Sequence, residues 1–191
     1  PTGALIGLVP LARAGRIAAE NPVVIDAKSG ASGAGRSAKI ELLFAELDEN
    51  VRAYGVGKHR HLPEITQELA AAGSTARVIF TPHLLPLRRG LLSTIYVSIQ
   101  GGAALRTVYE AAYPRPSFVE LLPEGCFPEV RDVRGTNHAQ IGWTVLEGNL
   151  AIVVTVIDNL GKGGAGQGVQ CLNVMFGLDE RTGLDHIAAV P

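Results

Sequence analysis

Cysteine is scarce in this sequence, which holds only Cys126 and Cys171 among its 191 residues. Two cysteines are too few for a disulfide-stapled fold, and they lack the paired spacing of a structural metal site. We therefore expect no bound metal, and a reducing cytoplasm as the compartment of the protein.

The sequence also lacks an excess of charge, because 17 lysines and arginines face 18 aspartates and glutamates, a net charge of -1. A chain without a basic surplus has no general means of holding nucleic-acid phosphates or an anionic membrane. Long hydrophobic runs are missing as well. No charge-free run is longer than residues 90–105, which contain polar residues and glycines and fall short of the roughly 20 apolar residues of a membrane-spanning helix. We expect no nucleic acid and no membrane as partners.

What the sequence does contain is 47% hydrophobic and 18% charged residues, a composition typical of a folded domain. The length fits one large domain or one and a half small ones. Glycine occurs 23 times, which predicts many tight turns or close backbone approaches. Because the chain opens on Pro1-Thr2-Gly3 without a methionine or a basic leader, we expect it to be part of a longer protein.

Hydrophobic periodicity predicts an α+β fold, with a mostly antiparallel sheet flanked by helices. Apolar residues at helical spacing, bounded by glycine or proline, predict helices over residues 5–15, 40–47, 62–72, 102–113 and 169–177. Runs of β-branched and apolar residues predict strands over residues 23–25, 51–56, 77–81, 91–100, 118–121, 130–133, 139–147 and 149–157. Glu147-Gly148-Asn149 is predicted to be the turn of a hairpin.

Two glycine-rich segments each precede a predicted helix. Residues 161–166 match G-x-G-x-x-G, but too few residues follow for the second parallel strand of a dinucleotide-binding unit, which favours a loop that allows close helix packing. In residues 29–36, three glycines and two serines would leave backbone N–H groups free for a ligand, and Arg36 adds a cation. A phosphate or cofactor site and a purely structural turn both remain open for this segment.

His59-Arg60-His61, with Glu64, lies where a predicted strand gives way to a helix. One interpretation is a solvated helix start, in which Glu64 supports the first turn. The other is a functional site, where a histidine transfers protons near neutral pH and Arg60 binds a carboxylate or a phosphate. The residues alone leave both open.

Four ordered blocks of the sequence, spread over almost its whole length, resemble the N-acetyl-gamma-glutamyl-phosphate reductase family. These blocks are Ser29-Gly30-Ala31-Ser32-Gly33-Ala34-Gly35-Arg36, His59-Arg60-His61-Leu62-Pro63-Glu64-Ile65, Val133-Arg134-Gly135-Thr136-Asn137 and Ile157-Asp158-Asn159-Leu160-Gly161-Lys162-Gly163, followed by Met175-Phe176-Gly177-Leu178. The resemblance implies a fold like the C-terminal catalytic domain of glyceraldehyde-3-phosphate dehydrogenase-like enzymes. It also implies that an NADP-binding Rossmann domain and the nucleophilic cysteine lie upstream of Pro1.

The resemblance implies a role for each candidate site residue. His61 would be the catalytic acid/base, although the choice between His59 and His61 stays open, and His59, Arg60 and Tyr54 would bind the acyl-phosphate substrate. The NADP-binding residues would be Ser29, Gly30, Ser32, Gly33, Ala34, Gly35, Arg36 and Asn159.

The resemblance further divides the chain into a catalytic and dimerisation domain, residues 1–160, and a helix and tail, residues 161–191, that pack on the upstream Rossmann domain. We expect a homodimer or a homotetramer, and an activity in arginine biosynthesis that the chain alone lacks. Two alternatives remain, namely the related lysine-pathway reductase of an aminoadipyl phosphate, and a non-catalytic binding or assembly module.

Overall fold

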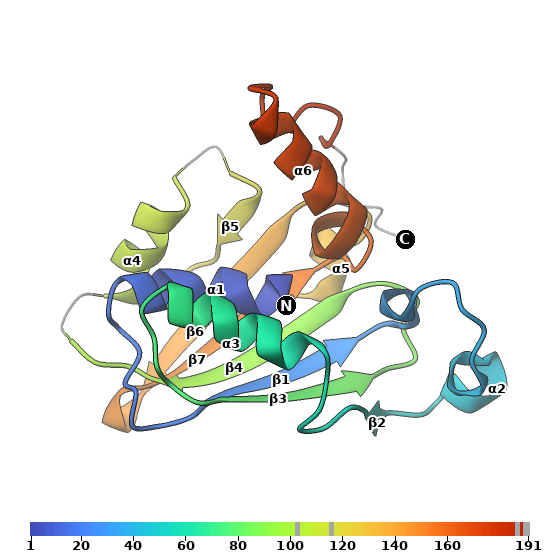
Figure 1. Ribbon diagram of the computed structural model, residues 1–191, viewed down its shortest axis with the longest axis horizontal. Helices are drawn as coiled ribbons and strands as arrows, with labels where there is room; N and C mark the ends of the chain where they lie inside the picture. The colour runs from blue at the N-terminus through green and yellow to red at the C-terminus, as the bar shows by residue number, and fades with distance from the viewer. Residues whose placement is uncertain (102–103, 115–116, 186–187, 189–191) are drawn as a thin grey trace.

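A computed structural model describes residues 1–101, 104–114, 117–185 and 188 of the chain. It contains one seven-stranded sheet in the order β2-β3-β1-β4-β7-β6-β5 (Figure 1). The strands are β1 (Val23–Ser29), β2 (Arg52–Ala53), β3 (Val78–Leu84), β4 (Leu91–Ser98), β5 (Val119–Leu121), β6 (Ala139–Leu146) and β7 (Leu150–Ile157). The α-helices are α1 (Thr2–Arg13), α2 (Phe44–Leu47), α3 (His61–Ala71), α4 (Leu105–Ala112), α5 (Val130–Val133) and α6 (Gly166–Met175). Short 3₁₀ turns are η1 (Ala31–Ala34), η2 (Ile40–Leu42) and η3 (Glu147–Asn149), and η4 (Gly161–Ala165) is a π-helical turn.

The predicted α+β class is confirmed, and the sheet is mixed with antiparallel pairs in the majority. Strand β1 pairs in parallel with β3, and β5 in parallel with β6, whereas the other four pairings are antiparallel. The predicted hairpin joins β6 to β7, and its turn residues Gly148 and Asn149 both have positive φ, as such a turn requires. Helices α1, α3 and α4 pack on one face of the sheet (Figure 1).

Helix α1 lies close to the sheet because two of its residues have no side chain. An added Cβ on Gly3 or Gly7 would already lie within 3.1–3.3 Å of side chains from β4 and β7. Pro10 lacks an N–H group, so the carbonyl of Ile6 has no helical donor. The Tyr113 hydroxyl donates to that carbonyl at 2.8 Å, and the Tyr109 hydroxyl donates to the neighbouring Gly7 carbonyl, also at 2.8 Å. Helix α4 therefore fixes the position of α1, and with it the start of the chain.

The strand predicted over residues 130–133 is wrong, because these residues form the short helix α5. The Asp132 side chain accepts the backbone N–H of Glu129, and the Glu129 side chain completes this capping box. Two β-branched valines favour a strand, but residues three apart share a face in a helical turn and lie on opposite faces of a strand. The segment before α5 crosses the face of β6 opposite to α1, where Gly142 leaves room for the Cys126 carbonyl.

The predicted helix over residues 40–47 and strand over residues 51–56 are largely wrong. The region contains only η2, α2 and the two-residue strand β2, and none of the residues in η2 or α2 is buried. Residues 36–53, which we call the arm, extend beyond the edge of the sheet (Figure 1). The helix predicted over residues 102–113 is present as α4, while residues 102–103 lie outside the described part of the chain.

Replacing Gly142 with alanine should lower the free energy of unfolding by about 1–3 kcal/mol, because the new methyl group collides with the Cys126 carbonyl oxygen. Gly168→Ala is the matched control, since a Cβ there meets nothing within 4 Å and helix propensity should raise stability by up to about 1 kcal/mol. Urea unfolding of both variants measures the difference. Shifts of the same sign in the two variants would contradict the close crossing at Gly142.

Candidate functional site

A cavity of about 200 Å³ opens where α1 begins, and three segments far apart in the sequence form its wall. The first segment contributes Ser29 and Gly33, the second Tyr54 and residues 59–61, and the third Asn159 and Gly163. Pro1 borders the same cavity. The complete lining is Pro1, Thr2, Gly3, Ala4, Ala27, Ser29, Gly33, Tyr54, His59, Arg60, His61, Phe80, Pro82, Leu91, Ser93, Ile157, Asn159 and Gly163.

The two histidines contact each other at the start of α3. The His59 ring makes edge-to-face contacts with the rings of Tyr54, His61 and Phe80, at centroid distances of 5.4, 4.7 and 5.3 Å. The backbone N–H of His61 donates to His59 Nδ1 at 3.2 Å, so a neutral His59 carries its proton on Nε2. The His59 ring is therefore held in one orientation, with one defined donor.

Burial keeps both imidazoles neutral at pH 7. It lowers the pKa of His59, with smaller contributions from the charges of Arg60 and the Pro1 amine. Burial also lowers the pKa of His61 to about 4, supported by the Pro1 amine, His59 and Arg60. A neutral imidazole can accept a proton, but a pKa of about 4 makes His61 a weaker base than free imidazole while the Pro1 amine is present. The pKa of Tyr54 is raised by burial, against opposing effects of Arg60 and a hydrogen bond with Ser29.

The glycine-rich segment 29–36 does not offer the free backbone N–H groups that its composition predicted. The N–H groups of Gly30, Ala31 and Ser32 donate to carbonyls of residues 90, 87 and 88, at 2.8–3.0 Å. Gly30 is needed for this approach, since a Cβ there would lie 2.8 Å from the Leu87 carbonyl oxygen.

Within segment 29–36, only Ser29 and Gly33 reach the cavity. Gly30 and Ser32 are tied to the neighbouring loop, and Ala34, Gly35 and Arg36 are exposed and outside the cavity wall. The segment is thus mostly a structural turn, with two residues positioned at the site.

Asn159 connects the first and third segments. Its Nδ2 donates to the Ser29 hydroxyl oxygen at 3.1 Å, and its Oδ1 accepts the backbone N–H of Gly90. Gly33 has to be glycine, because a Cβ there would lie 2.8 Å from Asn159 Nδ2 and 3.0 Å from Ser29 Oγ. Asn159 keeps a second Nδ2 hydrogen, which is not used by Ser29.

Asp158, which sequence analysis did not single out, is the anchor of the site. Its side chain is fully buried and accepts Arg89 Nε at 2.9 Å and Arg89 Nη2 at 2.6 Å. It also accepts the backbone N–H groups of Gly135, Leu160 and Gly161 at 2.8–2.9 Å. Burial alone would raise the pKa of Asp158, but these donors, Arg89 first, bring that pKa below its usual value.

The glycines of residues 161–166 serve close packing, as the sequence favoured. A Cβ on Gly161 would collide with the Thr136 carbonyl, and one on Gly166 would lie 2.5 Å from Asn137 Oδ1. The turn η4 and the start of α6 thereby pack on the 135–137 loop, which belongs to the third of the four sequence blocks.

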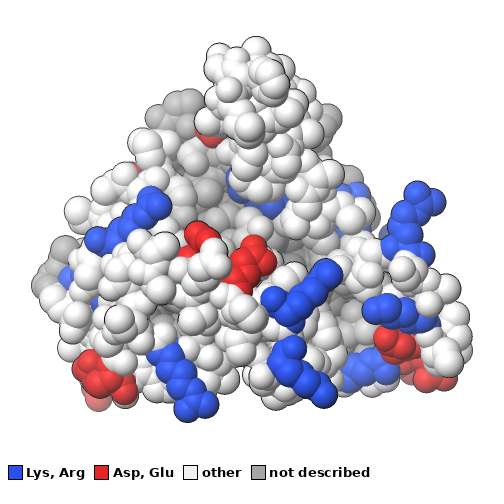
Figure 2. Space-filling view, viewed as in Figure 1, with Lys and Arg blue, Asp and Glu red and all other residues white. Residues whose placement is uncertain are grey.

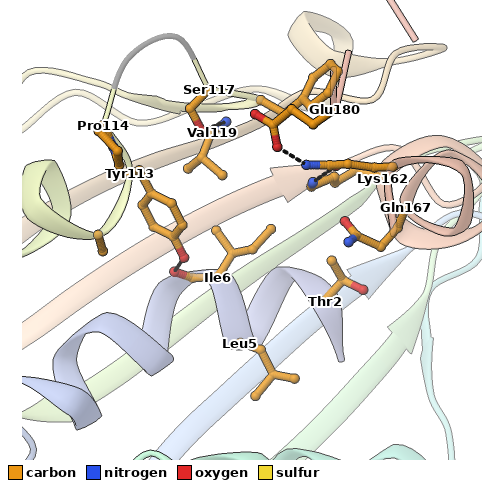
Figure 3. A pocket seen from close by; sticks show the side chains of 13 residues that line it. Thr2, Leu5, Ile6, Tyr113, Pro114, Ser117, Val119, Lys162, Gln167 and Glu180 are labelled. Carbon is orange, nitrogen blue, oxygen red and sulfur yellow. Dashed lines mark hydrogen bonds between the residues drawn. The ribbon is translucent and has the colours of Figure 1, made fainter. Parts of the chain in front are cut away.

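A second, larger cavity of about 610 Å³ lies between α1, the end of α4 and residues 162–180 (Figure 3). Figure 3 shows Lys162 and Glu180 on one side of it and Tyr113 on the other. Burial lowers the pKa of Lys162 to about 8, but its Nζ already donates to Gln170 Oε1, and Gln170 donates in turn to Glu180. Seven of the predicted site residues line the smaller cavity and none lines this one, so the smaller cavity is the candidate site.

The part of the chain that the structure describes contains neither a candidate metal site nor a membrane-spanning helix. Within that part of the chain, no three or more His, Cys, Asp and Glu side chains are grouped as metal ligands would be. None of its helices combines the length and the apolar character needed to cross a bilayer.

Asp158→Asn should lower the free energy of unfolding at pH 7 by about 2–4 kcal/mol, because Arg89 loses its charged partner. Asp26→Asn is the control, at a one-third exposed carboxylate that pairs with Lys28 and His83, and should cost less than about 1 kcal/mol. Urea unfolding measures both variants. Since the folded-state pKa of Asp158 lies below 3.8, its stabilisation should persist above pH 3.8 and disappear as the pH falls through the folded-state value. Equal losses in the two variants would contradict this assignment.

The pKa of His61 should appear as a pH dependence of stability. Between pH 6.5 and about 4 the unfolded chain binds a proton at this residue and the folded chain does not, so stability should fall as the pH drops through this window. His61→Gln should reduce that slope in denaturant unfolding. Ring-proton NMR reports on the residue directly, and a His61 signal that titrates at 6.5 in the folded chain would contradict the burial argument.

Comparison with known proteins places this geometry in a family. Residues 1–159 match the model of the semialdehyde dehydrogenase dimerisation domain. The N-acetyl-gamma-glutamyl-phosphate reductase of Halorhodospira halophila is 49% identical over 100% of this chain and 56% of its own length, and that of Geobacter sp. is 48% identical over 100% and 57%. The chain thus spans a little more than half the length of these relatives.

The fold comparison agrees with the sequence comparison. Aspartate semialdehyde dehydrogenase II from Vibrio cholerae superposes with a TM-score of 0.69 at 18% identity, over 91% of this chain and 59% of that one, which demonstrates a shared fold. The chain belongs to the semialdehyde dehydrogenase dimerisation-domain family, and the curated relatives that it matches over its full length are N-acetyl-gamma-glutamyl-phosphate reductases.

Proposed function

We propose that this chain is the catalytic and dimerisation part of an NADPH-dependent reductase that converts N-acetyl-L-glutamyl 5-phosphate to N-acetyl-L-glutamate 5-semialdehyde in arginine biosynthesis. The observation that carries the proposal is the single cavity in which Pro1, the histidine pair and Asn159 meet. The nucleophile of this reaction is a cysteine upstream of Pro1, as the family resemblance implies. Its thiolate attacks the acyl carbon, phosphate leaves, and a thioester forms.

His61 handles the protons of this reaction. In the longer protein Pro1 has no free amine, so the pKa of His61 is lowered less there than in this chain, and the neutral imidazole beside Pro1 takes the proton of the thiol that becomes the nucleophile. When the carbonyl carbon of the thioester is reduced, a proton must reach the carbonyl oxygen. The same oxygen must lose its proton when the C–S bond breaks and the aldehyde is released. His59 is the positioning partner, because its Nδ1 is tied to the His61 backbone.

Arg60 and Tyr54 bind the anionic substrate. Arg60 is an exposed cation at the cavity rim, suited to a carboxylate or a phosphate. Tyr54 keeps its hydroxyl proton at pH 7, since burial raises its pKa, and can donate to a substrate oxygen.

The fit of NADP to these residues is partial. A cavity of about 200 Å³ admits one ring rather than a dinucleotide. The free hydrogen of Asn159 Nδ2, beside Ser29 and Gly33, suits the carboxamide of a nicotinamide, while the N–H groups of residues 30–32 are committed elsewhere and cannot hold a pyrophosphate. When bound, the nicotinamide supplies the hydride that reduces the thioester. The remainder of NADP requires residues outside this chain.

Helix α6 supports a division of the protein at residue 160, with residues 161–191 packing on a Rossmann domain. Its end carries large apolar side chains that are 52–80% exposed: Leu172, Val174, Met175, Phe176 and Leu178. The projection that α6 forms in Figure 2 is largely free of charged side chains. Such a surface is typical of one that another domain covers. The residues of the tail at 186–187 and 189–191 lie outside the described part of the chain.

The assembly is a homodimer or a homotetramer that works in the cytoplasm. The description of the matching family model as a dimerisation domain supports the oligomer. The face of the sheet opposite α1 supports it as well, because Ile79 and Tyr96 are each 37% exposed there.

The test is a reductase assay on this chain joined to the upstream part of the Halorhodospira halophila relative. Oxidation of NADPH should depend on the acyl phosphate, and His61→Asn should lower kcat by a factor of about 10² or more. His83→Asn, at a histidine outside the cavity, is the matched control and should retain the activity. Full activity of His61→Asn would refute the acid/base role of His61. If the joined protein instead reduces only the aminoadipyl phosphate, or no acyl phosphate at all, the proposed substrate is wrong.

A further inference from the structure

We propose that the arm, residues 36–53, docks on a second copy of this chain and closes the dimer at the β2 edge of the sheet. This inference rests on the proposed dimer and adds the contact that forms it. The arm has little stabilisation of its own, since neither η2 nor α2 buries a residue. Its apolar side chains are nevertheless large and exposed: Ile40 is 74%, Leu43 56%, Phe44 80% and Val51 60% exposed.

The arm is held in a defined position despite this exposure. Strand β2 pairs with β3, and the Arg52 guanidinium donates to the Glu41 carbonyl within the arm. The segment that bears Phe44 therefore projects from the sheet edge as a folded unit (Figure 1). Ordering such a segment costs conformational entropy, and burial of its apolar side chains against a partner compensates for that cost.

The family match identifies the partner as a second copy. The dimerisation-domain model covers residues 1–159, so it includes the arm and ends before η4 and α6. Among the described residues, large apolar side chains are exposed inside the dimerisation domain, on the arm and at Ile79 and Tyr96 on the sheet, and beyond it on α6. We assign the surfaces inside the domain to contacts between copies, and the surface on α6 to the rest of the protein.

The charges of the arm suit a contact between identical surfaces. It carries three basic side chains, Arg36, Lys39 and Arg52, and four acidic ones, Glu41, Glu46, Asp48 and Glu49. In Figure 2 blue and red side chains lie close together at the end of the molecule where α2 projects. A two-fold contact places the same patch against itself, so a patch with both signs pairs without net repulsion.

Docking of the arm would also act on the candidate site. The chain enters the arm just after Gly33 and leaves it at Tyr54, and both residues line the cavity. The Tyr54 backbone N–H donates to the Pro82 carbonyl at 3.0 Å, which ties the end of the arm to β3. A docked arm therefore restrains both residues, and the site is best ordered in the dimer.

The experiment compares two exposed phenylalanines. Phe44→Glu places a charge on the arm, and Phe176→Glu places the same charge on α6 at a residue that is 71% exposed. Sedimentation equilibrium of the chain should show that Phe44→Glu raises the dimer dissociation constant by about tenfold or more, with Phe176→Glu close to wild type. Circular dichroism verifies the fold of each variant, which neither exposed residue should affect.

A second measurement needs no substitution. Amide hydrogen exchange over residues 40–53 of the wild-type chain should slow as the chain is concentrated through its dimer dissociation constant, while exchange over α6 should not. A dimer that Phe44→Glu leaves intact, or that Phe176→Glu weakens equally, would overturn the arm contact and leave the proposed reductase in place. A wild-type chain that is monomeric at all concentrations would overturn the proposed dimer as well.

Discussion

The carboxylate of Asp158 is the constraint on which the site depends. A buried charge needs full hydrogen bonding, and this one draws donors from Arg89, Gly135 and the 160–161 turn into a single point. Asn159, the next residue, is thereby fixed with its amide between Gly90 and Ser29. The Asp158 carboxylate does not line the cavity, but its hydrogen bonds hold the turn that places Asn159 in the cavity wall.

Much of the fold follows from local patterns in the sequence. Helix α1 and helix α3 have clear apolar periodicity, the β6–β7 hairpin has clear turn residues, and the structure confirms all three. The arm departs from its pattern. Ile40, Leu43 and Phe44 have helical spacing, yet no part of the described chain lies beneath them. Spacing reveals which side chains share a face, but not whether anything covers that face. The short helix α5 was missed because Val130 and Val133 are β-branched, which favours a strand, although a spacing of three residues places them on one face of a helical turn.

The sequence also indicated which segments carry the site, but not how their backbones are used. The N–H groups of residues 30–32 are satisfied by the 87–90 loop, a partner more than fifty residues away that glycine content cannot reveal. The sequence did contain a signal for Asp158, because this acidic residue directly follows a predicted buried strand. Two basic residues, Arg88 and Arg89, precede another predicted strand. Only the register of β4 and β7, which pairs Leu91 with Ile157, brings that acid and that base together.

If Asp158 makes the loops of the site one cooperative unit, native-state hydrogen exchange will show it. The amides of Gly90, Gly135, Leu160 and Gly161 in the wild-type chain should exchange with one common opening free energy, close to that of global unfolding. Fast and independent exchange of these amides, at the rates of exposed loops, would contradict it.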